Sequence, residues 1–326
     1  MKTTILNWLL VLFVSFSWGA SFMFTRLVVE EISPSHLVSI RLFLATLLLG
    51  PLFINKEELL KMSKVIPSLI LLGIINAALP FFLFAWSAQE LTAGMLSILN
   101  GTSPLFALII AIILFRQNTT FLQVIGLLAG FIGLFIFIGL DEIRVVFFPV
   151  TLCLIGAFCY AYSNNVLFKL NHINSSALAS ATMASGFIFS IPLFLSEPQS
   201  FSFDLSLKTY LATFFLGLVS TGISFIAYVV LLQRSSPVQA SSIIFLVPIT
   251  GIFWGAIFLN ENIDQKVILG SLCILIGIGL TNIFKPKKLL RDQLNNLRNI
   301  FWRPANNSFR PFYINWSFNE LRIFNH

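Results

Sequence analysis

Charged side chains are scarce in this sequence. Asp, Glu, Lys and Arg together make up 10% of the 326 residues, against roughly 25% in an average soluble domain. Hydrophobic residues reach 57%, and 36 positions are Phe. This small number of charges cannot form the hydrated surface of a soluble protein of this size. We therefore expect lipid to surround the protein. Intrinsic disorder is excluded as well, because a chain this apolar has ample surface to bury.

Cysteine and the motifs of common enzymes are also lacking. Cys153, Cys159 and Cys273 lie in apolar runs without C-x-x-C spacing, so neither a disulfide framework nor a zinc site is indicated. The sequence contains no G-x-S-x-G, no H-E-x-x-H and no P-loop. Its three histidines lie in polar breaks or near the C-terminus. We therefore predict no enzymatic activity, no cofactor and no metal.

The net charge of +7 is concentrated at one end of the chain. Residues 1–284 hold 12 basic and 11 acidic side chains, net +1, and residues 285–326 hold 8 basic and 2 acidic, net +6. A membrane core with a basic tail fits this distribution better than a nucleic-acid-binding protein. We expect residues 285–326 to form a cytoplasmic tail that is partly amphipathic, over 288–302, or disordered.

Long apolar segments fill the rest of the chain. Ten of them are close to the 20 residues that a helix needs to cross a bilayer. In lipid each must be helical, because an isolated strand would leave its backbone polar groups unpaired. The predicted fold class is an all-α membrane protein with ten transmembrane helices. Their approximate limits are 6–25, 37–55, 66–87, 94–115, 121–140, 147–168, 177–195, 210–232, 239–259 and 267–284.

Lys and Arg in the loops predict the orientation. With the N-terminus inside, eleven basic residues of the loops and the start of the tail are cytoplasmic and five are external. Because positively charged loops resist translocation, we expect both termini in the cytoplasm and the protein in the inner membrane.

An offset of 144 residues aligns the chain with itself. The matches are rich in Gly, Pro and Gln, which indicates two homologous halves at 5–140 and 147–284. Each half has five spans, an odd number, so the second half would be inverted relative to the first. Pro104 and Pro248 fall halfway along matched segments and predict broken or kinked helices near a binding site. The aligned pairs are Leu72/Leu216, Gly73/Gly217, Phe81/Phe225, Gln89/Gln233, Ser97/Ser241, Pro104/Pro248, Gly126/Gly270 and Gly133/Gly277.

Several short motifs carry a resemblance to a known family. They are Ser17–Ser21 (SWGAS), Arg41, Leu99–Phe106 (LNGTSPLF), Pro237–Ser241 (PVQAS) and Leu246–Pro248 (LVP). In this order they resemble the EamA-type members of the drug/metabolite transporter superfamily over about residues 5–284. The resemblance implies a ten-helix carrier of small organic solutes, often working outward, with a pocket lined by the first, third and fourth helices of each half.

Two departures from the family pattern concern acidic residues. The family usually has a Gly-Glu pair after the fourth helix of each half; here the second half reads Asn260-Glu261 and the first Phe115-Arg116. For Glu261 we expect a structural role at a helix end. Four-helix multidrug relatives couple protons through a Glu in the first helix, and residues 6–25 contain no acid. A proton or an exchanged solute remains the possible coupling partner.

The candidate substrate-binding residues are polar, aromatic or helix-breaking side chains within the spans. Arg41 and Glu90 are expected to pair at the outer end of the first half, with snorkelling to the interface as the alternative. For the aromatic residues the alternative is lipid contact, and for the carboxamides hydrogen bonding between helices. The full set is Trp18, Arg41, Asn76, Trp86, Gln89, Glu90, Asn100, Pro104, Tyr160, Asn164, Tyr228 and Pro248.

The expected function is therefore that of a permease. It would move a small organic metabolite or drug-like solute across the cytoplasmic membrane by alternating access, in the direction of efflux. A channel or uncoupled facilitator is the alternative, which a scarcity of pore-lining charge disfavours. The expected partners are the solute and the lipid bilayer, and no nucleic acid.

Overall fold

The computed structural model describes residues 2–53, 56–113, 119–139, 143–197, 204–234 and 237–283. Over these ranges the regular elements are all helical, which confirms the all-α fold class. The amphipathic tail expected beyond residue 284 lies outside the described residues. The elements are α1 (Lys2–Val28), α2 (Pro34–Phe53), α3 (Lys56–Ser63), α4 (Ile66–Leu72), η1 (Gly73–Ala78), α5 (Leu79–Ser87), α6 (Ala93–Gly101), α7 (Ser103–Ile113), α8 (Phe121–Ile138), α9 (Ile143–Lys169), α10 (Ser175–Ser196), α11 (Leu207–Phe214), η3 (Phe215–Ile223), α12 (Ser224–Arg234), α13 (Pro237–Leu259) and α14 (Gln265–Ile283).

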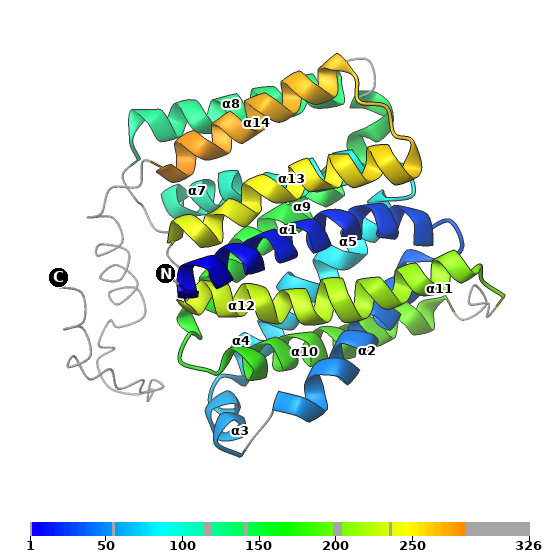
Figure 1. The fold of residues 1–326 in the computed structure, drawn as a ribbon, viewed down its shortest axis with the longest axis vertical. Coiled ribbons are helices and arrows are strands. Elements are labelled where there is room, and N and C mark those ends of the chain that lie inside the picture. The colour runs from blue at the N-terminus through cyan, green and yellow to red at the C-terminus, as the bar shows by residue number, and fades with distance from the viewer. Residues whose placement is uncertain are drawn as a thin grey trace, which may run out of the picture. The chain divides into compact units, whose positions relative to one another are not determined.

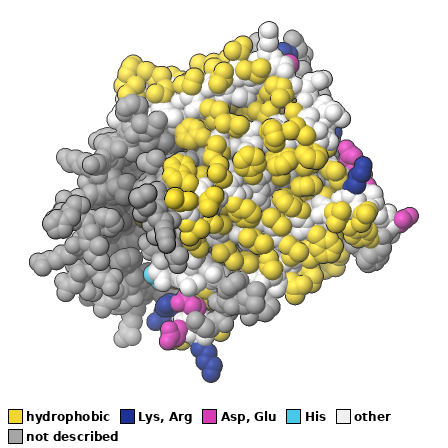
Figure 2. Space-filling view, in the orientation of Figure 1, with side chains coloured by type: hydrophobic (Ala, Val, Ile, Leu, Met, Phe, Trp, Pro, Cys, Tyr) yellow, Lys and Arg dark blue, Asp and Glu magenta, His cyan; other side chains and the backbone are white. Residues whose placement is uncertain are grey.

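Among the described residues, seven stretches of helix are long and apolar enough to cross a membrane. They are Ile5–Val28, Ile66–Ser87, Ala93–Ile113, Phe121–Ile138, Val146–Lys169, Ser175–Ser196 and Leu207–Gln233. Three shorter apolar helices, Pro34–Gly50, Ile243–Leu259 and Gln265–Thr281, coincide with the other predicted segments. Hydrophobic side chains cover the middle of the face in Figure 2, and charged ones lie at its margins. The chain is a multi-pass integral membrane protein.

Polar side chains fix several helix starts. Thr92 accepts a hydrogen bond from the backbone N–H of Met95 at the start of α6. Thr120 and Gln123 form a reciprocal capping box at the start of α8. Ser206 caps α11 by accepting a hydrogen bond from the backbone N–H of Thr209. Such caps satisfy N–H groups that have no partner within the helix, so they define where a span begins.

The helices lie roughly parallel or antiparallel to one another in a layered bundle (Figure 1). Helices α8 and α14 pack side by side along one edge. Helix α1 packs against α13 on one side and α12 on the other, and α10 packs against α2. Segments distant in sequence therefore supply most neighbours within the bundle.

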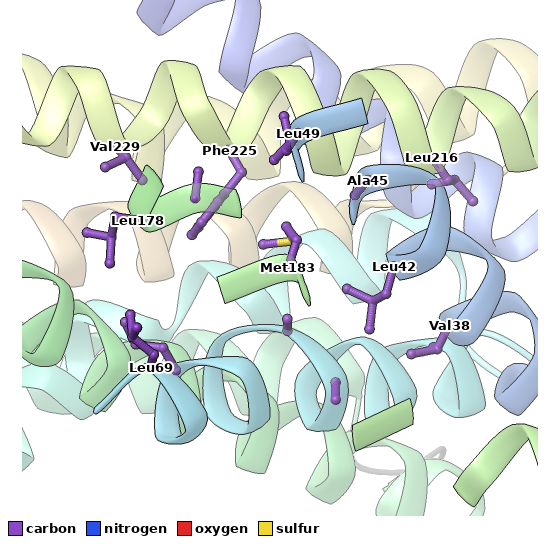
Figure 3. Packing of buried hydrophobic residues seen from close by; sticks show 14 of the residues in the cluster. Val38, Leu42, Ala45, Leu49, Leu69, Leu178, Met183, Leu216, Phe225 and Val229 are labelled. Carbon is purple, nitrogen blue, oxygen red and sulfur yellow. The ribbon is translucent and has the colours of Figure 1, made fainter. Parts of the chain in front are cut away.

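Two clusters of buried hydrophobic residues form the core. One lies between α2, α10 and the η1 and η3 segments, where Leu42, Met183 and Leu216 converge (Figure 3). The other is built mainly from α1, α6, α9, α13 and α14. Trp18 and Tyr228 pack against both clusters. These two rings therefore mark the boundary between the two parts of the core.

Glycine allows α8 and α14 to approach backbone to backbone. A Cβ atom on Gly126 would lie 2.7 Å from the carbonyl oxygen of Gly277, and a Cβ atom on Gly277 would lie 2.6 Å from that of Gly126. A Cβ atom on Gly133 would lie 2.8 Å from the carbonyl oxygen of Gly270. No side chain fits at these distances, as expected for small residues at a membrane helix crossing.

Candidate functional site

Arg41 is a buried cation in the second turn of α2. Only 8% of its surface is exposed. Its Nε donates a hydrogen bond of 2.5 Å to the hydroxyl of Thr221 in η3, and its guanidinium lies 4.0 Å from the ring centroid of Phe81 in α5. The Thr221 bond and the aromatic face together hold the guanidinium in place and provide a cation–π interaction.

Trp18 and Tyr228 join α1 to the eighth span. The indole Nε1 of Trp18 donates to the backbone carbonyl of Ser220, 3.1 Å away, and its ring centroid lies 4.9 Å from that of Tyr228. The Tyr228 hydroxyl in turn donates to Oδ1 of Asn164 on α9, 3.0 Å away. Both polar groups on these partly buried rings are thus hydrogen-bonded, as is usual for Trp and Tyr in a protein interior.

Helix α9 supplies the remaining side of the site. Ser163 accepts a 2.7 Å hydrogen bond from Nδ2 of Asn76 in η1. Tyr160, one turn away, stacks on Phe84 of α5. A chain of contacts thereby links Arg41, Thr221, Ser220, Trp18, Tyr228 and Asn164, and Tyr160 lies one turn from Asn164 on α9. We call these residues, with Asn76, Phe81 and Ser163, the central cluster.

Two π-helical segments carry part of this cluster. Asn76 lies in η1 (Gly73–Ala78), and Ser220 and Thr221 lie in η3 (Phe215–Ile223). In η3 the Thr221 hydroxyl donates to the carbonyl of Leu216, five residues earlier. π-Helical turns are rare and occur frequently at functional sites. The sequence analysis did not predict them; the aligned Gly73 and Gly217 were the available signal.

The expected pairing of Arg41 with Glu90 is wrong. Glu90 is exposed, and within the described ranges no carboxylate lies within ion-pair distance of Arg41. The preceding residue, Gln89, is also exposed, and its carbonyl accepts a hydrogen bond from Arg26, as does that of Ala88. Arg26 thus satisfies the carbonyls after α5. Glu90 lies in solvent, and Arg41 contacts Thr221 and Phe81 instead.

Trp86 lies outside the central cluster. It is near the end of α5, where its ring packs edge to face on Phe148 of α9 at 5.1 Å. This contact places Trp86 in the packing between α5 and α9 rather than in the central cluster.

Pro104 and Pro248 were expected to break their helices in equivalent ways, but the structure places them differently. The fourth span is interrupted at Thr102, between α6 and α7, and Pro104 stands in the first turn of α7. Pro248 lies inside α13, which runs without interruption, and it packs against Gly101. The part-buried Asn100 also lies beside this crossing of α6 and α13. The matched irregularities are the π segments of the third and eighth spans instead.

Glu261 joins the loop after α13 to the start of α6. Its carboxylate accepts hydrogen bonds from the backbone N–H groups of Ala93, at 2.6 Å, and Gly94, at 3.0 Å. An anion at a helix N-terminus is favoured both by the unpaired N–H groups and by the helix dipole. This arrangement agrees with a structural role for Glu261.

The described residues contain no group of three or more His, Cys, Asp or Glu side chains placed to hold a metal ion. The central cluster instead offers hydrogen-bond donors and acceptors, one cation and aromatic faces. These groups suit reversible binding of a small molecule within the membrane.

The family model described as the EamA-like transporter family matches the chain at residues 6–139 and again at 147–283. The chain belongs to this family, which confirms the resemblance found in the sequence motifs. The membrane-spanning helices and the family match together indicate a helical membrane transporter of small solutes.

Known relatives support this assignment. An uncharacterized transporter of Archaeoglobus fulgidus is 23% identical, with 83% of this chain and 97% of the relative covered. The uncharacterized transporter YoaV of Bacillus subtilis is 25% identical, with 82% and 94% covered. A probable terminal-alkyne amino-acid exporter of Streptantibioticus cattleyicolor is 22% identical, with 86% and 95% covered. One solved crystal structure shares the fold with a TM-score of 0.59 at 11% identity, covering 87% of this chain and 98% of that one.

Proposed function

We propose that the protein is a permease that exports a small organic solute across the inner membrane by alternating access between two inverted five-helix halves, 5–140 and 147–284. The central cluster is its binding site. The observation that carries this proposal is that the cluster is shared between the halves: Arg41 of the first half bonds Thr221 of the second, and Trp18 of the first packs on Tyr228 of the second. A site divided in this way changes its access when the halves rock against each other.

Equivalent helices that pack in antiparallel pairs support an inverted repeat. On α8 and α14, Gly126 meets Gly277 and Gly133 meets Gly270, so rising residue numbers on one helix face falling numbers on the other. On α2 and α10, Ser39 bonds the carbonyl of Ser190 while Leu42 lies beside Gly186. A two-fold axis in the membrane plane predicts such pairs.

The third and eighth spans give independent support. Gly73 and Gly217 are 144 residues apart, and both stand in π-helical segments. Gly73 packs against Ser185 of α10, and Gly217 packs against the backbone of Arg41 on α2. Arg41 and Ser185 are themselves 144 residues apart. The matching glycines thus lie where equivalent helices meet, η1 against α10 and η3 against α2, as expected from duplication of one ancestral unit.

The direction and the orientation rest on the loop charges and on the relatives. The excess of basic residues in the loops on one side favours both termini inside. The S. cattleyicolor relative is called an exporter, and we transfer that direction to this chain. Reporter fusions test the orientation. A cytoplasmic reporter should be active after residues 60 and 284 and an external reporter after residue 91, and any reversal would refute it.

Counterflow in proteoliposomes tests the transport mechanism. Radiolabelled amino acids, nucleosides and cationic drugs form the first substrate panel. A carrier gives saturable, exchange-stimulated uptake, and Trp18→Ala should reduce it strongly. Trp8→Ala is the matched control, because Trp8 is on the same helix and 43% exposed. Flux that rises linearly with concentration, or equal loss in both variants, would overturn the proposal of an alternating-access site at the central cluster.

A further inference from the structure

Arg41 carries a buried positive charge that has no counterion among the described residues. Its guanidinium contacts two neutral groups, the Thr221 hydroxyl and the Phe81 ring. The ion pair found among the described residues, Lys61 with Glu58, belongs to α3. A charge in the interior of a membrane protein is costly unless another group offsets it. The structure therefore leaves a negative group to be supplied from elsewhere.

The guanidinium also has hydrogen-bond donors to spare. Arginine has five N–H groups, of which Nε uses its single one on Thr221. Within the described part of the chain, the two terminal amino groups of Arg41 donate no hydrogen bond. These amino groups form the fork that binds a carboxylate in a bidentate manner. The Thr221 bond and the Phe81 face hold this fork in a fixed orientation.

The neighbouring groups are aromatic and neutral. The Trp18 and Tyr228 rings lie beside the same η3 segment that holds Thr221. The Ser220 hydroxyl there is buried and has no hydrogen-bond partner. Because buried hydroxyls are nearly always hydrogen-bonded, this group also has capacity for a ligand. The cluster contains no acid that would bind an ammonium group.

The two halves differ at this position. Ser185 occupies the position 144 residues after Arg41, and its hydroxyl likewise lacks a hydrogen-bond partner. The duplicated framework therefore presents one cation and one hydroxyl rather than two cations. One negative charge on the ligand is therefore sufficient to neutralise Arg41.

We propose that the transported solute is a small monocarboxylate with an apolar body and no ammonium group, whose carboxylate binds the Arg41 fork while its apolar part lies on Trp18 and Tyr228. This inference rests on the proposed transport function and defines its substrate class. Thr221 acts as a positioning residue, because it orients the guanidinium through Nε.

Four probes of graded charge test the substrate class. Phenylpyruvate and 4-methyl-2-oxopentanoate are monocarboxylates, phenylalanine is a zwitterion, and phenyltrimethylammonium is a permanent cation. Binding is measured on the purified full-length protein as a ligand-dependent rise in unfolding temperature, and transport as counterflow in proteoliposomes. We expect both monocarboxylates to bind and exchange, and the cation to do neither.

Variants then test the residues. Arg41→Gln should lower the apparent affinity for phenylpyruvate at least about tenfold, because it removes a charge-assisted bidentate contact. Arg41→Lys should retain part of the binding. Thr221→Val should raise KM more than it lowers the maximal rate, which a purely structural defect would not do. Arg26→Gln is the control, because Arg26 contacts backbone carbonyls at the end of α5 and lies outside the central cluster.

The outcomes separate this inference from the proposed function. Exchange of phenylalanine or phenyltrimethylammonium without the monocarboxylates would overturn the substrate class and leave the carrier intact. Phenylpyruvate exchange that is equal in wild type and in folded Arg41→Gln would overturn the role of Arg41. Arg41-dependent binding without any saturable exchange would uphold the anion site and refute the transport function. Absence of monocarboxylate binding to the folded wild-type protein would overturn the inference directly.

Discussion

The crossing of α8 and α14 yields a sharp stability prediction, because two glycines on one helix have opposite surroundings. A Cβ atom on Gly277 would lie 2.6 Å from both the carbonyl oxygen of Gly126 and the backbone nitrogen of Gly130. A Cβ atom on Gly279, two residues further along α14, would meet nothing closer than 3.9 Å. Gly277→Ala should therefore destabilise the protein, whereas Gly279→Ala should not.

The size of the loss of stability follows from the distances at this crossing. Real Cβ contacts essentially never fall below 3.0 Å, so Gly277→Ala must move the helices apart by at least 0.4 Å (3.0 − 2.6). The obstructing atoms are backbone, so no rotamer change relieves the clash. Overpacking of this kind costs about 1–3 kcal/mol. Gly279→Ala gains helix propensity of up to about 1 kcal/mol without a clash.

Unfolding of the detergent-solubilised protein, followed by size-exclusion chromatography after heating or by titration with SDS, measures both variants against wild type. Gly133→Ala extends the test to the other half, since Gly133 precedes Gly277 by 144 residues and its Cβ atom would lie 2.8 Å from the carbonyl oxygen of Gly270. Its destabilisation should match that of Gly277→Ala within about 1 kcal/mol. Equal stability of Gly277→Ala and Gly279→Ala would refute the reasoning.

Three further predictions concern single side chains. In a thermal unfolding assay, Glu261→Gln should lower stability by about 1–3 kcal/mol, because it weakens two charge-assisted hydrogen bonds to the start of α6. Glu90→Gln, at an exposed position, should be neutral in the same assay. The hydrogen bond from Lys61 lowers the pKa of Glu58 below its ordinary value of 4.5. The contribution of ionised Glu58 to stability is therefore present above pH 4.5 and is lost as the pH falls through the lowered pKa. Unfolding midpoints measured from pH 7 to pH 3 should fall less steeply in Glu58→Gln than in wild type. Trp18→Phe keeps an aromatic ring beside the eighth span but removes the indole donor. Counterflow by Trp18→Phe should therefore run at a rate between those of wild type and Trp18→Ala. A wild-type rate in both variants would contradict a role of Trp18 in binding.

The order and type of the helices could be predicted from the sequence because they depend on local composition. A run such as 121–140 can only be helical in lipid, and the structure has α8 at Phe121–Ile138. The third span was placed correctly at 66–87, where α4, η1 and α5 follow one another. Its π-helical middle was not predicted, because the apolar run 66–87 has the same composition for an α- or a π-helical turn; in the structure Gly73 of this segment packs against Ser185 of α10.

The candidate site could be predicted in part. Trp18, Arg41, Asn76, Tyr160, Asn164 and Tyr228 were singled out because polar or amphipathic side chains inside apolar spans need partners, and the structure brings these six together. Thr221, Ser220 and Phe81 were not singled out as site residues. Ser, Thr and Phe occur throughout the spans, so composition gives no signal that distinguishes these three.

The sequence by itself determined that the chain spans a membrane as helices and that it resembles this transporter family. The first property follows from the cost of exposing backbone and side-chain dipoles to lipid, which acts on each segment separately. Only the tertiary structure decided which groups meet. Arg41 pairs with a threonine 180 residues away rather than with Glu90, because helix packing places η3 beside α2 and leaves Glu90 in solvent.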